Sequence, residues 1–215
     1  MNTLRIRHGA LAVTAAVVLP LSLTACSDSG SDTKAAPPAS AAADPATGTS
    51  PQKDATAMDE PFGPACAGVP KNGAGSFDGM AKDPVATAAS NNPALSTLVT
   101  AVKQAGLVDT LNNAQNITVF APTNGAFAKI PKADLDKVLA DKATLTKILT
   151  YHVVGERLAP KQLENGSFGT LQKGMITTKG SGEDYTVNDT SKVVCGNVRT
   201  ANANVYIVDT VLMPE

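Results

Sequence analysis

The sequence is 215 residues long, with 43% hydrophobic and 17% charged residues, a formal net charge of −1 and no tryptophan. Nucleic-acid binding rests on clustered lysine and arginine, and the absence of a basic stripe argues against it. The same absence disfavours an electrostatic membrane-binding face.

The N-terminus has the pattern of a secretory signal. Arg5 and Arg7 precede an apolar run that begins at Ala10 and ends in Leu23-Thr24-Ala25-Cys26. A positive region, an apolar region and a small-residue cleavage site make such a signal. Ending it in a cysteine makes it resemble the bacterial lipobox, in which the cysteine is acylated and becomes the new first residue.

Two alternatives to the lipobox are an ordinary signal and a membrane helix, but the apolar run is about 14 residues, shorter than the ~20 that span a bilayer. We therefore expect residues 1–25 to be a lipoprotein signal peptide. Lipid on Cys26, with acyl chains such as palmitate, would tether the protein to the extracytoplasmic face of the cell membrane. A shed or secreted form is a further expectation.

The rest of the chain divides into a tether and a domain. The first 25 residues hold two of the 18 basic residues and none of the 19 acidic ones, so the remainder carries a net charge of about −3. Residues 26–60, rich in Ala, Pro, Ser and Asp, cannot bury enough surface to fold and predict a disordered tether. Residues 61–215 are the right length for one domain.

The first half of this domain predicts helices. Asp83-Pro84 and Asn92-Pro93 are helix starts, and apolar residues at helical spacing follow until Gly106, a plausible C-cap. The expected helical positions are Leu95, Leu98, Val99 and Val102, then Leu107, Val108 and Leu111, then Phe127 and Ile130 after a Thr123 cap, then Leu135, Val138 and Leu139, and then Leu145, Ile148 and Leu149 after Asp141. The glycine-rich stretch 73–79 reads as a flexible lead-in.

The second half predicts strands. Residues 117–121 form an early strand stopped by Pro122. The later strands are expected at 151–154, 168–171, 175–178, 185–187, 192–198 and 205–212, with 180–184 as a hairpin connection. Helices followed by strands predict an α+β fold with an antiparallel sheet.

The cysteines form a pair once Cys26 is assigned to lipid. Cys66 and Cys195 remain, and in an oxidising compartment a disulfide is the simplest reading. It would close a loop of about 130 residues, for which chain entropy gives ~4–5 kcal/mol. The alternatives are two free thiols and, with less support, a metal site, since no second pair of ligands lies near either cysteine.

Three segments together resemble the fasciclin (FAS1) domain. They are Thr118–Phe127, the Tyr-His box Ile148–Val154 and the closing segment Ala201–Pro214. One departure is Gly125, where Glu is frequent in the family. The resemblance implies a twisted β-wedge of about seven strands beside a layer of short helices, in a family whose members are mostly adhesion modules at cell surfaces and in extracellular matrix.

The resemblance also suggests where the protein binds. Tyr151 and His152 would belong to an adhesive surface. The alternative is that His152 forms an internal hydrogen bond, for instance to the region of Thr123 and Asn124. The expected partner is an extracellular matrix protein such as collagen, a glycan or another cell-surface molecule. A second hypothesis places a lipid or small metabolite in a pocket between the β-wedge and the helices.

The sequence gives little reason to expect an enzyme. His152 is the only histidine outside the signal, and no Gly-x-Ser-x-Gly elbow is present. Asp134, Asp136 and Asp141 are interleaved with lysines on a solvated helical region, which is not the pattern of a metal site. We therefore expect no catalytic residue, metal or cofactor.

Overall fold

Seven strands form one sheet in the computed structural model, which describes residues 60–214. The signal peptide, Cys26 and nearly all of the expected tether lie outside these residues. The strands are β1 (Ile117–Pro122), β2 (Val153–Val154), β3 (Asn165–Gly169), β4 (Met175–Ser181), β5 (Asp184–Val187), β6 (Ser191–Arg199) and β7 (Ala203–Val208). Their order is β2-β1-β7-β6-β5-β4-β3, and a bridge between Val154 and Thr170 brings the two ends of the sheet together in a nearly closed wedge.

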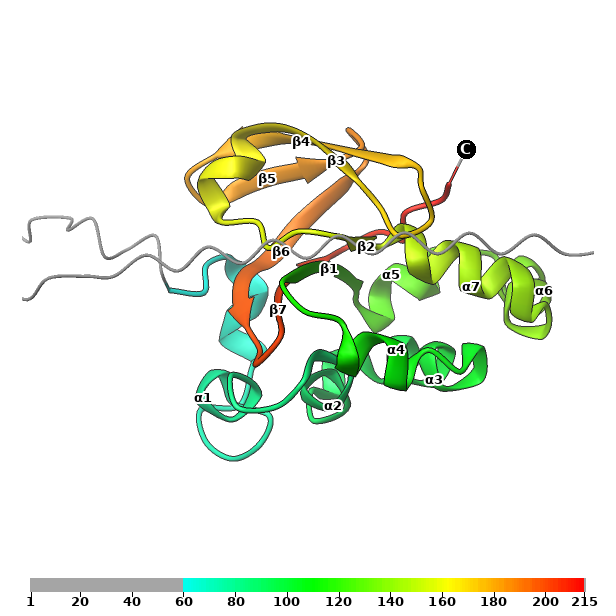
Figure 1. Ribbon diagram of the computed structural model, residues 1–215, viewed down its shortest axis with the longest axis horizontal. Coiled ribbons are helices and arrows are strands. Elements are labelled where there is room, and N and C mark those ends of the chain that lie inside the picture. The colour runs from blue at the N-terminus through cyan, green and yellow to red at the C-terminus, as the bar shows by residue number, and fades with distance from the viewer. Residues whose placement is uncertain (1–59, 215) are drawn as a thin grey trace, which may run out of the picture. The chain divides into compact units, whose positions relative to one another are not determined.

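Short helices lie below the strands and to their right in Figure 1. They are α1 (Phe77–Met80), α2 (Val85–Ser90), α3 (Ser96–Ala105), α4 (Val108–Asn113), α5 (Asn124–Ala128), α6 (Lys132–Ala140) and α7 (Lys142–Tyr151), with 3-10 turns η2 (Pro64–Gly68), η3 (Pro93–Leu95) and η4 (Pro160–Glu164). The expected α+β class is confirmed. Among the described residues, no helix combines the length and the apolar character that crossing a bilayer requires.

The helix ends follow the sequence signals. The side chains of Thr123 and Asp141 accept hydrogen bonds from the backbone N–H groups of Ala126 and Ala143, which caps α5 and α7. Gly106 ends α3 in the left-handed conformation, with φ of 71°, which glycine adopts without steric cost. These caps and this glycine define where the helices start and stop through local interactions alone.

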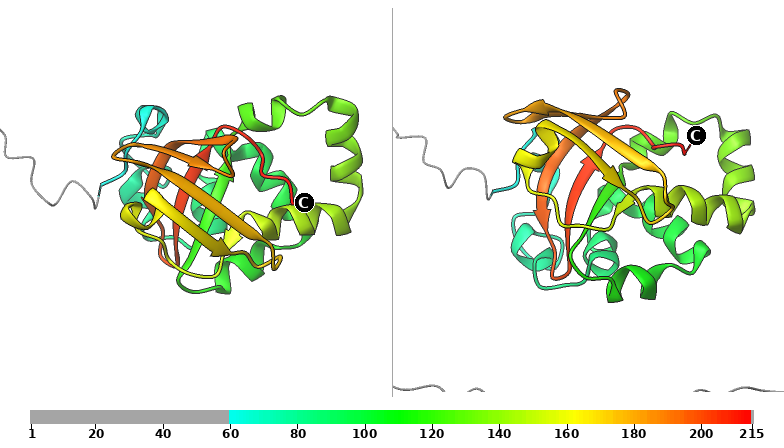
Figure 2. Two further views of the ribbon diagram at one scale, coloured as in Figure 1. Left: turned by 90° about the horizontal axis from the view of Figure 1, so that it is seen from above. Right: turned by 45° about the horizontal axis from the view of Figure 1, so that its top comes forward.

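Two apolar clusters flank the central strands. Val119 and Ile207 point toward the helices and belong to a cluster that includes Leu95 and Ala101. Phe120 and Tyr206 point into the wedge, where they join Ile176 and other apolar side chains under β3, β4 and β5. Every residue of β1 and β7 is therefore buried. The views of Figure 2 show these two strands running beneath β3 and β4.

The expectation of an antiparallel sheet is wrong for one pair. β1 and β7 run parallel, from Ile117 opposite Ala203 to Pro122 opposite Val208. The other paired strands are antiparallel. Parallel strands need a long crossover and are usually buried on both faces. The segment between β1 and β7 provides that crossover, and both strands have continuous apolar runs.

Two further expectations need correction. The stretch 151–154 is a strand only at Val153 and Val154, because α7 continues through Tyr151 and His152 is its C-cap. Ile148, Leu149 and Tyr151 pack inward at helical spacing, which extends α7 into the expected strand. The glycine-rich stretch 73–79 is an ordered turn, in which the Ser76 side chain accepts a hydrogen bond from the N–H of Gly79 and starts α1.

A disulfide joins Cys66 in η2 to Cys195 in β6, across a sequence separation of 129 residues. Cys195 is completely buried. Beside it, the backbones of Phe62 and Gly196 form a bridge through two hydrogen bonds. The start of the domain is thus attached to one of its last strands.

Candidate functional site

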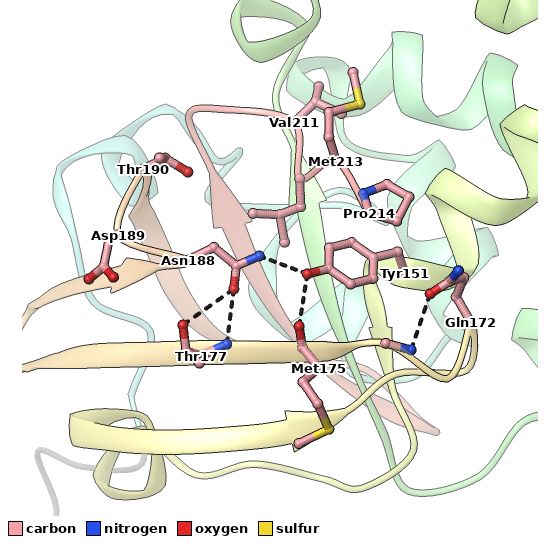
Figure 3. Close-up of a pocket in the computed structure, with 12 residues that line it drawn as sticks. Tyr151, Gln172, Met175, Thr177, Asn188, Asp189, Thr190, Val211, Met213 and Pro214 are labelled. Carbon is pink, nitrogen blue, oxygen red and sulfur yellow. Dashed lines mark hydrogen bonds between the residues drawn. The ribbon is translucent and has the colours of Figure 1, made fainter.

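A cleft of about 680 Å³ lies between the start of β4, the β5–β6 turn and the chain that follows β7. Figure 3 shows it as an open groove with Tyr151 at its centre. This volume is within the range of roughly 300–1,000 Å³ that ligand clefts occupy. The groove residues are Tyr151, Gln172, Gly174, Met175, Thr177, Asn188, Asp189, Thr190, Val211, Leu212, Met213 and Pro214.

The Tyr151 side chain supports one side of the groove through its hydroxyl group. Its hydroxyl donates to the carbonyl oxygen of Met175 at 2.8 Å and accepts from Nδ2 of Asn188 at 2.9 Å. Both bonds are drawn in Figure 3. The last residue of α7 therefore connects that helix to β4 and to the β5–β6 turn.

The β5–β6 turn is shaped by Asn188 and Asp189, whose φ angles are 50° and 55°. Two successive positive φ values are typical of a tight hairpin turn, and Asn and Asp tolerate them better than other side chains. The N–H of Thr177 donates to Oδ1 of Asn188 at 2.9 Å, and the N–H of Asn188 donates to the carbonyl of Thr177. The turn is thereby fixed against β4.

His152 holds the opposite side of the groove. The backbone N–H of Leu212 donates to its Nε2 at 2.9 Å. Nδ1 therefore carries the proton and donates to the carbonyl of Ile148 at 2.8 Å. Burial lowers the pKa of His152 to about 4, against the opposing effect of the bond to Ile148. A neutral imidazole thus fixes the C-terminal segment.

Asp209 anchors the start of the same C-terminal segment. Burial alone would raise the pKa of its carboxyl, but hydrogen bonds from the backbone of Lys192 and from Lys129 and Thr210 outweigh that effect and lower it. The bond from the Lys192 N–H measures 2.8 Å and the Lys129 ion pair 3.0 Å. The segment after β7 is therefore held at Asp209 and at Leu212.

The structure supports the internal reading of the Tyr-His box over an exposed adhesive surface. The exposed fractions of Tyr151 and His152 are 5% and 2%, so they support the groove from inside and present little surface to a partner. His152 does form internal hydrogen bonds, but not to the region of Thr123 and Asn124. The residues of that region bond to other helices: Thr123 caps α5, and Oδ1 of Asn124 accepts a hydrogen bond from the N–H of Thr97 in α3.

The groove surface combines exposed methionines with uncharged polar groups. Met175 and Met213 are 55% and 46% exposed. Among the described residues that line the groove, Asp189 is the only charged one, and it forms an ion pair with Lys179 at 3.1 Å. Within residues 60–214, no cluster of three or more His, Cys, Asp or Glu side chains could hold a metal ion.

The space expected between the wedge and the helices is small. A gap lined by Leu98, Val102, Val119 and neighbouring apolar residues has a volume of about 40 Å³. Since ligand pockets typically need several hundred Å³, this gap is a packing defect in the core. A lipid does not fit there.

The groove residues outside the Tyr-His box were not predicted from the sequence. Asn188 and Asp189 were given no role, and Met213 was part of the closing segment Ala201–Pro214. A usable signal was the Asn-Asp pair between two β-runs, which is turn chemistry. Nothing local indicates that this turn meets α7, because the contact joins residues 37 positions apart.

Comparisons with known proteins bear on the family and the fold of this chain. The fasciclin domain model matches residues 93–214. The chain is 51% identical over 147 residues to the cell surface glycolipoprotein MPB83 of Mycobacterium bovis, with 66% of each chain covered, just under two thirds of that relative. It is 48% identical over 160 residues to the immunogenic protein MPB70 of the same species, covering 71% of this chain and 81% of that one.

A solved structure has the same fold. It is a FAS1 domain pair from the insect cell adhesion molecule fasciclin I, with a TM-score of 0.53 and 21% identity, covering 64% of this chain and 53% of the other. The likeness bears on the fold alone. The expected seven-stranded wedge with short helices is confirmed by it.

Proposed function

The chain belongs to the fasciclin family, and from that premise we propose that it is a non-catalytic adhesion module at the cell surface. Members of the family mostly act in adhesion, and the relative MPB83 is named a cell surface glycolipoprotein. For this chain, the proposal rests on the open groove, which has two exposed methionines. Both residues of the Tyr-His box support this groove through hydrogen bonds.

The second part of the proposal is that lipid on Cys26 tethers the domain to the extracytoplasmic face of the membrane. The lipobox and the name of MPB83 support it. Cys26→Ser should move the protein from the membrane fraction to the soluble fraction or leave it unprocessed. Continued membrane association of the variant, with a lipid mass on the chain, would overturn the tether.

Binding of the full-length chain, purified in detergent, to a panel of surfaces tests adhesion. The panel holds collagens, fibronectin, glycosaminoglycans and bacterial envelope polysaccharides. Met213→Gln changes the groove, and Leu171→Gln is its matched control, because Leu171 is 43% exposed but does not line the groove. Saturable binding that Met213→Gln weakens and Leu171→Gln preserves supports the proposal. Absence of saturable binding across the panel argues against it.

A further inference from the structure

We propose that the groove binds an uncharged, extended peptide segment of the partner, with apolar side chains of that segment seated against Met175 and Met213. This inference rests on the proposed adhesive function and gives it a partner chemistry. It follows from three properties of the groove: its unused hydrogen-bonding groups, its apolar edges and its charge.

The first property is a set of hydrogen-bonding groups that the domain itself does not use. Within residues 60–214, Nε2 of Gln172 and the hydroxyl of Thr190 have no partner, and neither have the backbone N–H and C=O of Met213. A free backbone donor and acceptor beside free side-chain donors match the alternating N–H and C=O groups of an extended peptide. The C-terminal segment could thus pair with a guest strand.

The second property is the apolar surface. Met175 and Met213 are about half exposed, and the half-buried Pro214 adds apolar surface beside Met213. Methionine is flexible and polarizable, so it adapts to side chains of different shapes. Figure 3 shows Met213 and Met175 on opposite sides of Tyr151, one on the C-terminal segment and one on β4, with both thioethers directed away from Tyr151. A peptide that crosses the groove and continues over its two edges would meet both.

The third property is charge. Among residues 60–214, no Lys or Arg lines the groove, so a sulfated glycan or a lipid phosphate would find no counter-charge in this lining. The carboxylate of Asp189 forms an exposed ion pair with Lys179, which reduces its attraction for a basic peptide. A neutral glycan fits less well than a peptide, because Tyr151, the one aromatic ring in the described lining, is 5% exposed and offers little face for a sugar to stack on.

Selection of peptides on the full-length chain tests the inference. The probe is a phage library of random peptides of about 12 residues, panned in parallel on the unchanged protein, Met213→Gln, Met175→Gln and Leu171→Gln. Enriched peptides are then synthesised, and their affinities for the four proteins are measured by fluorescence anisotropy. Circular dichroism checks that all four proteins fold alike.

We expect uncharged peptides with spaced apolar residues to be enriched. Each groove substitution should weaken their binding by about tenfold or more, as for an interface anchor, whereas Leu171→Gln should leave it unchanged. No enrichment, or equal binding to all four proteins, overturns the inference. Groove-dependent binding of a neutral polysaccharide without peptide binding also overturns it, while leaving the adhesive function intact. Groove-dependent peptide binding without saturable binding to any panel surface supports the inference and argues against adhesion.

Discussion

Acid should destabilise this domain through His152 as the pH falls below about 6.5. The imidazole is 2% exposed, and its Nε2 must stay unprotonated to accept the N–H of Leu212. Burial lowers its pKa from 6.5 to about 4. The unfolded chain therefore binds a proton near pH 6.5, while the folded chain resists it until about pH 4.

The sign and size of the effect follow from linkage. A depressed histidine pKa contributes stability that is fully present above about pH 6.5 and is lost as the pH falls toward 4. A difference of about 2.5 pKa units corresponds to roughly 3 kcal/mol, a sizeable part of the ~5–15 kcal/mol typical of domains. Asp141 and Asp209 have pKa values below 3.8, so the stability they contribute is lost at lower pH.

Urea unfolding between about pH 7.5 and 4.5 measures the effect. Far-UV circular dichroism is the appropriate signal, because the chain has no tryptophan. The comparison protein is His152→Gln, because a glutamine side chain does not titrate. His8, the only other histidine, is replaced by Gln in both proteins.

We expect the protein with His152 to lose most of the ~3 kcal/mol by pH 4.5, and the His152→Gln protein to show a nearly flat profile over the same range. Hydrogen exchange at the Leu212 amide should accelerate first, because a protonated Nε2 cannot accept its hydrogen bond. Equal pH profiles for the two proteins would refute the reasoning, since His152 would then not be withheld from protonation.

Three further substitutions test other parts of the structure. Cys195→Ser should lower the free energy of unfolding by roughly 4 kcal/mol in the chain-entropy view, and an unchanged urea midpoint would contradict a stabilising disulfide. Gly180→Ala should destabilise, because its φ is 148° and a Cβ would clash with the carbonyl oxygen of Asp184, whereas Gly182→Asn, at φ of 63° in open space, should be tolerated in the same thermal melt. Asn124→Ala removes the side chain that joins α5 to the start of α3 and should lower the free energy of unfolding in urea by about 1–2 kcal/mol. A decrease below a few tenths of a kcal/mol would show that these hydrogen bonds do not stabilise the fold.

The local signals in the sequence were sufficient for most of the fold. Caps such as Thr123 and Asp141 and the left-handed Gly106 define helix ends within a few residues of the chain. The direction of β7 could not be predicted in the same way. It runs parallel to β1, which the long crossover between the two strands permits. The residues inside either strand do not specify that pairing.

The groove was harder to predict than the fold because it is assembled from distant segments. The bond between Tyr151 and Asn188 spans 37 residues, and the one between His152 and Leu212 spans 60. A sequence motif shows which residues are neighbours along the chain, but not the directions of their side chains. A strand was expected at 151–154, whereas α7 continues through Tyr151 and both side chains of the Tyr-His box are buried.

The burial of the Tyr-His box changes how a loss of adhesion should be interpreted. Tyr151 secures β4 and the β5–β6 turn, and His152 secures the C-terminal segment, so two adjacent residues hold both sides of the groove. Replacing both with alanine would deform the groove and abolish binding even though neither touches the partner extensively. Only substitutions at exposed positions such as Met213, compared with Leu171, separate contact from support. If Met213→Gln binds normally while Tyr151→Phe and His152→Gln do not, the partner binds elsewhere on the domain, and the box acts through the stability of the fold.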